Sequence, residues 1–133
     1  MARIVLVMHA PLGSAFASCA QHVLGQSADL TVFDVQPNGK PDALVPELTH
    51  IMRQWPNDPI LVLCDIYGAT PFNVARHAAD SCVARGLAVQ LLTGTSLAMV
   101  LKAITAQDKD LGLLAESVRR AGARGIITAE SGA

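Results

Sequence analysis

Residues 59–65 read Pro59-Ile60-Leu61-Val62-Leu63-Cys64-Asp65, an unbroken apolar run that ends in a carboxylate. A strand with one face in water alternates apolar and polar residues, whereas a strand covered on both faces has no such alternation. The run therefore predicts a strand that is buried on both faces, as in a parallel sheet flanked by helices.

A second run of this kind opens the chain, where Ile4-Val5-Leu6-Val7-Met8 is followed directly by His9. Shorter apolar runs of similar character occur further along the chain. The five expected strands lie near residues 3–8, 30–35, 59–65, 88–93 and 124–128.

Helical patterns separate these runs, with apolar residues recurring three and four positions apart. The first helix is expected to run from an N-cap at Ser14 to a C-cap at Gly25. The other helices are expected over residues 44–55 with Pro46 in the opening turn, from Thr70-Pro71 to just before Gly86, from Ser96, and from about Asp110.

Strands that alternate with helices predict a doubly wound α/β fold with a mainly parallel sheet. Economy of connection suggests the strand order 2-1-3-4, which places the first and third strands side by side, and with right-handed crossovers the winding reverses between them. Ligands of such sheets bind beyond the carboxyl ends of the strands, where the order reverses. His9 and Asp65 end those two strands, so we expect both to face one crevice.

The composition fits one domain spanning residues 1–133, because 51% hydrophobic and 16% charged residues supply a conventional core. The net charge of -1 and the lack of a Lys/Arg cluster argue against nucleic-acid binding. The apolar start of the chain is too short for a signal peptide, and no run is long enough to cross a membrane. We therefore expect a cytoplasmic protein without direct membrane insertion.

The three cysteines, Cys19, Cys64 and Cys82, lack the spacing of metal ligands and lie among apolar neighbours. This pattern is typical of buried thiols in a reducing compartment. No pair of His, Cys or carboxylate residues at helical spacing is joined by a third ligand, so no metal site is expected. No nucleotide cofactor is expected either, because neither a Walker motif nor a dinucleotide fingerprint follows any strand.

The roles expected for His9 and Asp65 depend on whether the two side chains are in contact. A histidine at a strand end is usually a loop residue, and a carboxylate there is usually a turn or cap residue. If Asp65 accepts a hydrogen bond from Nδ1–H of His9, however, it fixes the tautomer in which Nε2 keeps its lone pair. That nitrogen is then ready to attack an electrophilic phosphorus or to take a proton.

The segment Tyr67-Gly68-Ala69-Thr70-Pro71-Phe72-Asn73 follows the third strand and is expected to start a helix. Thr70 is expected as the N-cap, and its hydroxyl is also available to a bound anion. Gly68 allows a tight turn close to a ligand. Gly13-Ser14 offers a second, weaker cluster of N–H groups at the same edge, and Asp34 is interpreted as an ordinary strand-end acid.

Together these motifs resemble the IIA component of the mannose family of the bacterial sugar phosphotransferase system (PTS). The resemblance runs nearly end to end and depends on four stretches. They are Ile4-Val5-Leu6-Val7-Met8-His9, Gln36-Pro37-Asn38-Gly39, Asp65-Ile66-Tyr67-Gly68-Ala69-Thr70-Pro71-Phe72-Asn73 and Leu92-Thr93-Gly94. The third stretch is the specific one, with the pattern Asp-x-aromatic-Gly-x-Ser/Thr-Pro-Phe-Asn.

The resemblance implies that His9 is phosphorylated on Nε2 by the phosphocarrier protein HPr and passes the group to a separate IIB component. Asp65 would orient the ring, and Gly68, Thr70 and Phe72 would bind the phosphoryl group. Neither a metal nor a nucleotide is implied. The resemblance also implies a homodimer in which the strand near residues 124–128 pairs antiparallel with the partner's sheet, which would cover an exposed edge.

Two stretches depart from the family pattern. Ala10 replaces the glycine that commonly follows the histidine, and Pro11 stiffens the loop after it. Gly94-Thr95-Ser96-Leu97-Ala98-Met99 stands where the family usually has Gly-x-Asn-x-Pro-Met. The second difference leaves the contacts with a IIB partner open. A regulatory protein, which binds a target according to its phosphorylation state without sugar transport, is therefore the alternative. The phosphotransferase subunit that serves dihydroxyacetone kinase fits residues 70–73 less well.

Overall fold

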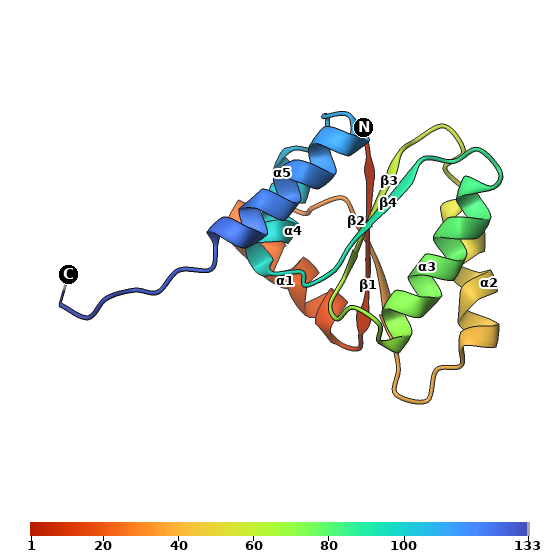
Figure 1. Cartoon of the computed structure of the whole chain (residues 1–133), viewed down its shortest axis with the longest axis horizontal. Helices are drawn as coiled ribbons and strands as arrows, with labels where there is room; N and C mark the ends of the chain where they lie inside the picture. Colours follow the sequence, from red (N-terminus) through yellow and green to blue (C-terminus); the bar gives the residue numbers. More distant parts are fainter. Residues whose placement is uncertain (133) are drawn as a thin grey trace.

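The computed structural model describes residues 1–132. Its elements are β1 (Arg3–His9), α1 (Leu12–Leu24), β2 (Leu30–Val35), α2 (Pro41–Met52), β3 (Ile60–Cys64), α3 (Thr70–Val83), β4 (Val89–Leu92), α4 (Leu97–Thr105) and α5 (Leu111–Arg124). The four strands form one parallel sheet, with α2 and α3 on one face and α1, α4 and α5 on the other (Figure 1). This is the doubly wound α/β fold that the sequence predicts.

The strand order is β2-β1-β3-β4, which confirms the predicted order. β1 lies between β2 and β3 and pairs parallel with both. In this register Val7 lies opposite Cys64, and His9 lies opposite Val35. Because His9 is two residues beyond Val7 and Asp65 is one residue beyond Cys64, both predicted site residues emerge at the same edge of the sheet.

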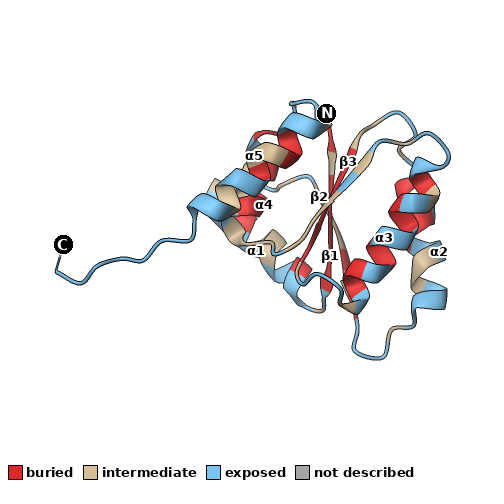
Figure 2. Ribbon diagram, viewed as in Figure 1, coloured by how far each residue is buried: buried red, intermediate tan, exposed pale blue. Residues whose placement is uncertain are grey.

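The two central strands are buried on both faces, as their unbroken apolar runs predict. All of β3 is buried, and so are residues 4–8 of β1. Figure 2 shows buried residues along the central strands and on the helix faces that cover them. Alternate side chains enter two separate cores: Val5 and Val7 pack toward α2 and α3, whereas Leu6 and Met8 pack toward α1, α4 and α5. His9 continues the series of Val5 and Val7, so its side chain lies on the side of the sheet that α2 and α3 cover.

Some predicted helix ends are confirmed and the predicted start of the first helix is wrong. Gly25 ends α1 in the left-handed region at φ 73°, and Oγ of Ser96 caps α4 by accepting from the N–H of Met99 at 3.4 Å. α1, however, begins at Leu12, so Ser14 lies inside its first turn.

The predicted start of the second helix is also wrong. α2 begins at Pro41, so Pro46 lies in its interior and not in its opening turn. Proline at the first helical position has no N–H to satisfy and a preset φ, which favours the earlier start. The helix ends at Met52, and Trp55 lies beyond it with its ring centroid 5.1 Å from Cζ of Arg3.

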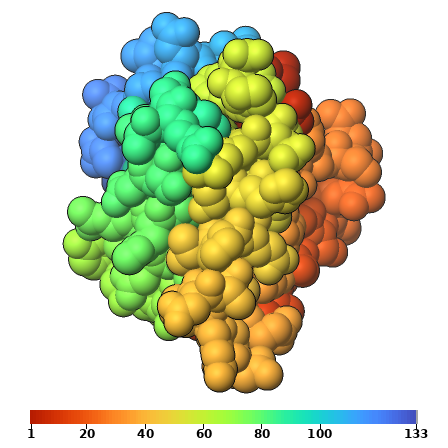
Figure 3. Space-filling view, turned by 90° about the vertical axis from the view of Figure 1, so that its right-hand side faces the viewer, coloured from red at the N-terminus to blue at the C-terminus, as the bar shows by residue number. Residues whose placement is uncertain are grey.

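The loop between β2 and α2, residues 36–40, protrudes at the lower end of the molecule (Figures 1 and 3). A hydrogen bond of 2.9 Å from the N–H of Gly39 to the carbonyl of Gln36 closes its turn. Pro41, which follows the loop, lines a surface cleft together with Asn73 and His77 of α3. The loop therefore borders the carboxyl edge of the sheet beside the first turns of α3.

The run near residues 124–128, expected as a fifth strand, forms no strand in the single chain. Arg124 ends α5, and residues 125–132 belong to no helix or strand. Ile126 and Ile127 are 86% and 76% exposed. Pairing of this segment with a second copy stays a prediction.

The cysteines are not all buried. Cys64 and Cys82 are buried as expected, but Cys19 is exposed, so the expectation for that residue is wrong. α1 turns the face with Ala20 toward the core, and the neighbouring position points about 100° away around the helix. Burial, with a smaller contribution from the charge of Asp65, raises the pKa of Cys64 to about 12, so this thiol stays protonated beside the site.

We expect Leu63→Ala to lower the free energy of unfolding by about 2–5 kcal/mol, because Leu63 is fully buried in the sheet and its removal leaves a cavity. Leu113→Ala is the matched control: Leu113 is 63% exposed on α5, and we expect a change within about 0.5 kcal/mol. Urea unfolding of both variants measures the difference. Equal effects would contradict the assignment of β3 as a strand buried on both faces.

Candidate functional site

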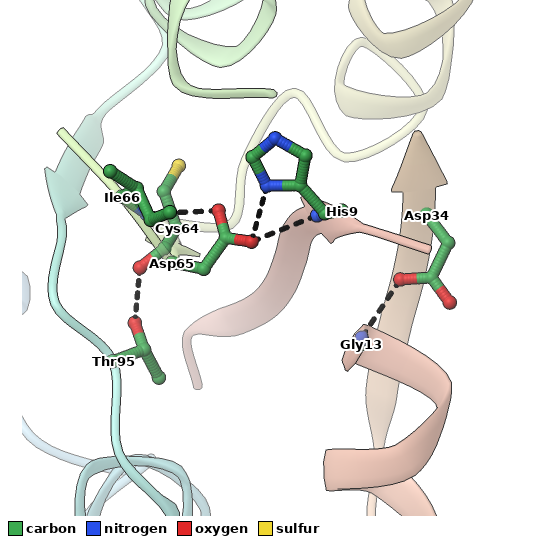
Figure 4. A network of polar contacts seen from close by, with 7 residues as sticks. All are labelled: His9, Gly13, Asp34, Cys64, Asp65, Ile66 and Thr95. Atoms are coloured by element: carbon green, nitrogen blue, oxygen red, sulfur yellow. Dashed lines mark hydrogen bonds and ion pairs between the residues drawn. The ribbon is translucent and has the colours of Figure 1, made fainter. Parts of the chain in front are cut away.

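His9 ends β1 and Asp65 follows β3, and the carboxylate binds the histidine at two points (Figure 4). Oδ2 of Asp65 accepts a hydrogen bond from the backbone N–H of His9 at 2.9 Å. The same oxygen lies 2.7 Å from Nδ1 of the His9 ring. The structure therefore brings the predicted pair together, and Asp65 holds both the backbone and the ring of His9.

The carboxylate of Asp65 is nearly buried, with 7% of its side chain exposed. Its other oxygen, Oδ1, accepts a hydrogen bond from the N–H of Ile66 at 2.9 Å. Burial alone would raise the pKa of this carboxyl group, but the hydrogen bonds from His9 and Ile66 outweigh it and hold the pKa of Asp65 below its usual value. Asp65 is therefore ionised at neutral pH and acts as an acceptor for the ring.

The second nitrogen of the His9 ring faces away from the carboxylate. When Nδ1–H donates to Asp65, Nε2 is left with its lone pair. The His9 side chain is 49% exposed, and Figure 4 shows Nε2 pointing away from Asp65. The result is an oriented and accessible nitrogen that can act as a nucleophile or a base.

Thr95 holds the end of β3 through hydrogen bonds, a role that the sequence did not predict. Its Oγ1 donates to the carbonyl of Cys64 at 2.7 Å, and its N–H donates to the same oxygen at 3.2 Å. The N–H of Gly94 donates to the carbonyl of Asp65 at 3.0 Å. The loop after β4 thus fixes the backbone that carries Asp65. The only signal for this role is the position of Thr95 directly after the stretch Leu92-Thr93-Gly94.

The segment after Asp65 makes a tight turn into α3, as its motif predicts. Gly68 has a φ of 83°, a conformation that glycine adopts without strain. Nδ2 of Asn73 donates to the carbonyl of Gly68 at 3.2 Å. The ring of Tyr67 packs on the buried Phe72 with 4.8 Å between ring centroids. These contacts tie the turn to the start of the helix.

The prediction that Thr70 caps α3 is wrong. The helix begins at Thr70 itself, the N-cap is Ala69, and no side chain caps the helix. Within residues 1–132 the N–H groups of Thr70 and Phe72 donate to no acceptor, and Pro71 has no N–H. The first turn of α3 therefore offers two free N–H groups and the exposed side chain of Thr70 at the carboxyl edge of the sheet.

The second cluster of N–H groups, expected at Gly13-Ser14, is already occupied by Asp34. Its carboxylate accepts from the N–H of Gly13 at 2.8 Å, from the N–H of Ser14 at 3.1 Å and from Oγ of Ser14 at 2.7 Å. Asp34 lies at the end of β2, as the sequence predicts, and its carboxylate binds the start of α1. Ser14 lies inside the first turn of α1 and therefore does not cap it; its hydroxyl binds the carboxylate of Asp34 in β2.

The remaining candidate ligands are dispersed. Within residues 1–132 no three His, Cys, Asp or Glu side chains gather in a way that would hold a metal ion. His22, His50 and His77 are exposed on α1, α2 and α3. The carboxyl edge of the sheet thus carries one oriented imidazole and, at the start of α3, free N–H donors, which suits the transfer of an anionic group.

A comparison with protein families identifies the family of this chain. The family model EIIA-man, described as PTS system fructose IIA component, matches residues 3–119. This chain belongs to that family. The match covers β1 and α3, and with them every candidate residue of the IIA site.

Solved structures share the fold of this IIA protein. Phosphotransferase system component EIIA from Streptococcus agalactiae is 22% identical, with a TM-score of 0.85 over 96% of this chain and 97% of that chain. The mannose/sorbose specific IIA subunit from Enterococcus faecalis is 23% identical, with a TM-score of 0.86 over 96% and 94%. A sigma-54 interaction domain protein from Enterococcus faecalis is 18% identical, with a TM-score of 0.77 over 93% and 92%.

Family membership assigns the IIA protein to the sugar PTS and, in broad terms, to phosphotransfer. None of the helices in residues 1–132 is both long and apolar enough to cross a bilayer.

The lowered pKa of Asp65 links the stability of the IIA protein to pH. A carboxyl group with a lower pKa in the folded state stabilises the fold above its unfolded pKa, and this stabilisation is lost as the pH falls through the folded value. We expect the difference in free energy of unfolding between the wild type and Asp65→Asn to be largest near neutral pH. It should shrink as the pH falls below the ordinary value of 3.8.

Urea unfolding at a series of pH values measures this difference. Asp108→Asn, which removes an exposed carboxylate, controls for the change in net charge. A difference for Asp65→Asn that does not vary with pH would contradict the hydrogen-bonded, ionised state of Asp65.

Proposed function

We propose that this IIA protein is a phosphoryl carrier of the sugar PTS in which Nε2 of His9 is the transient acceptor. The observation that supports this most is the 2.7 Å contact between Nδ1 of His9 and Oδ2 of Asp65, because it orients Nε2 outward. Family membership supports the broader part of the proposal. In this proposal residues 1–133 act as one IIA domain.

In the forward step, the lone pair of Nε2 attacks the phosphorus of the group carried by HPr. The Nε2–P bond forms as the bond from phosphorus to the donor breaks, and the donor leaves with its electron pair. The proton on Nδ1 stays between the ring and Asp65, so the attack needs no prior proton transfer. The second step is the same exchange with a IIB component as acceptor. Neither step uses a metal or a nucleotide.

We assign phosphate binding to Gly68, Thr70 and Phe72. The free N–H groups of Thr70 and Phe72 donate to the phosphoryl oxygens, and the Thr70 hydroxyl adds a third donor. The side chain of Phe72 is buried, so its contribution comes from its backbone. Gly68 provides the turn that precedes these donors. The helix N-terminus also favours the negative charge of the group.

We expect the wild type, incubated with phosphoenolpyruvate, enzyme I and HPr, to acquire an acid-labile, alkali-stable phosphate. His9→Ala should abolish the labelling, since it removes the acceptor. His22→Ala is the matched control, because His22 is exposed on α1, and it should be labelled like the wild type. Asp65→Ala should keep the fold but slow phosphorylation about 10- to 100-fold, because the wrong tautomer becomes populated.

Initial rates of labelling measure these effects. Labelling of His9→Ala at the wild-type level would exclude His9 as the acceptor. Unchanged kinetics of Asp65→Ala would remove Asp65 from the mechanism.

A regulatory role is the second candidate, in which phosphorylation of His9 changes the affinity for a protein target and no sugar is moved. The alternative is suggested by the name of one protein with the same fold, the sigma-54 interaction domain protein. Co-purification of a IIB protein that accepts the phosphoryl group would support transport. Stable association with an unrelated regulator, dependent on the phosphorylation of His9, would support control.

We also propose that the protein is a homodimer in which residues 124–128 pair antiparallel with β4 of the partner. β4 pairs with β3 on one side, and its other side is an open edge of the four-stranded sheet. A cleft of about 480 Å³, lined by Leu91 and Leu92 of β4, lies along this edge. The exposed Ile126 and Ile127 supply apolar side chains that such pairing would bury.

We expect the double substitution Ile126→Lys and Ile127→Lys to convert the dimer to a monomer, because two charges replace the apolar side chains of the pairing strand. Sedimentation equilibrium measures the mass. Val23→Lys is the control, since Val23 is 54% exposed on α1, and this variant should stay dimeric. A monomeric wild type would contradict the proposed dimer.

A further inference from the structure

Asp34 binds the start of α1 through three hydrogen bonds, which form a clasp of Asp34, Gly13 and Ser14. Oδ1 accepts from the N–H of Gly13 at 2.8 Å, and Oδ2 accepts from the N–H of Ser14 at 3.1 Å and from its Oγ at 2.7 Å. In the register of β1 and β2, Asp34 lies opposite Met8, one residue before His9. Figure 4 shows the Asp34 carboxylate pointing toward Gly13, away from the His9 ring. The clasp therefore lies beside the backbone at the end of β1, on the face of the sheet opposite to the His9 ring.

Gly13 leaves space that the clasp requires. A Cβ at this buried position would overlap Oδ1 of Asp34 and lie 3.0 Å from Cγ1 of Val32. Any side chain at position 13 must therefore displace the Asp34 carboxylate from α1. A substitution at either Asp34 or Gly13 should therefore disrupt the clasp.

The clasp also fixes the short connection that follows His9. The N–H of Ala10 donates to the carbonyl of Val35 at 2.9 Å, which binds the first residue of the connection to β2. The helix begins two residues later, at Leu12, and the next two N–H groups are those bound by Asp34. Both ends of the connection are therefore attached to β2.

The N-termini of α1 and α3 at this edge differ in whether their N–H groups are already bound by a carboxylate. A helix N-terminus attracts anions through its free N–H groups and partial positive charge. In α1 a carboxylate of the protein already occupies this position, whereas the N–H groups of Thr70 and Phe72 in α3 bind no acceptor within residues 1–132. Of these two helices, only α3 therefore has free N–H groups in its first turn within residues 1–132.

We propose that Asp34 is a positioning residue for phosphoryl transfer. It occupies the N-terminus of α1, so that α3 keeps the free N–H groups, and it fixes the connection that holds His9 at the end of β1. This inference rests on the proposed function of His9, and the test below separates the two.

The kinetic test compares variants on both sides of the clasp under the same labelling conditions. We expect Asp34→Ala and Gly13→Ala to slow the phosphorylation of His9 about tenfold per folded molecule, since a small displacement of reacting groups has an effect of this size. Asp34→Asn, which keeps an acceptor for the Gly13 N–H, should recover part of the rate. Ser14→Ala is the milder control and should stay within about threefold, because two of the three hydrogen bonds remain.

A second measurement uses inorganic phosphate as the probe and reads the backbone amide signals by NMR. In the wild type, phosphate should leave the signals of Gly13 and Ser14 unchanged, because Asp34 holds these groups. In Asp34→Ala both signals should shift on titration with phosphate. A purely structural role of Asp34 would lower thermal stability without producing this new response.

The outcomes separate the two proposals. If the wild type is labelled and folded Asp34→Ala is labelled at the same rate, the inference about Asp34 is wrong and the function of His9 stands. If phosphate shifts Gly13 and Ser14 in the wild type as strongly as in Asp34→Ala, the inference is also wrong. If the wild type is not labelled at all, the proposed function fails, and this inference fails with it.

Discussion

One carboxylate oxygen, Oδ2 of Asp65, sets the geometry of the whole site. It binds both the backbone N–H and the ring Nδ1 of His9, at 2.9 and 2.7 Å. A carboxylate with 7% of its side chain exposed has lost most of its hydration, and N–H donors replace the missing water. Because His9 supplies two of those donors, the contacts that keep Asp65 charged are the same contacts that orient the ring. The orientation of Nε2 is therefore a consequence of satisfying a nearly buried charge.

The sequence was sufficient to predict this pairing because it depends on strand order. The apolar runs ending in His9 and Asp65 predict doubly buried strands, and the order with the shortest connections places these strands side by side. A period of two then determines which core each side chain enters, so even the side on which the His9 ring lies follows from Val5 and Val7. The sequence therefore predicts the pairing of His9 with Asp65 and the face of the sheet on which the ring lies.

The features that could not be predicted depend on partners distant in the chain. Serine and threonine are common helix N-cap residues, yet neither Ser14 nor Thr70 caps its helix. The hydroxyl of Ser14 binds Asp34, 20 residues away, and no local pattern reports such a contact. Thr95 is similar, since its role is to bind the carbonyl of Cys64, 31 residues away. Local signals identify residues that can form a hydrogen bond, whereas the tertiary structure decides with which group they form it.

The turn that leads into α3 connects the site to the open edge of the sheet. Tyr67 and Phe72 pack on each other and also line the cleft beside β4, together with Arg76 and Leu91. Phe72 contributes a free N–H to the first turn of α3 while its ring is buried beneath Tyr67. A chain seated along β4 would therefore contact the same aromatic pair that holds this N–H in place. One small group of side chains thus links the open edge of the sheet to the turn that carries the free N–H groups.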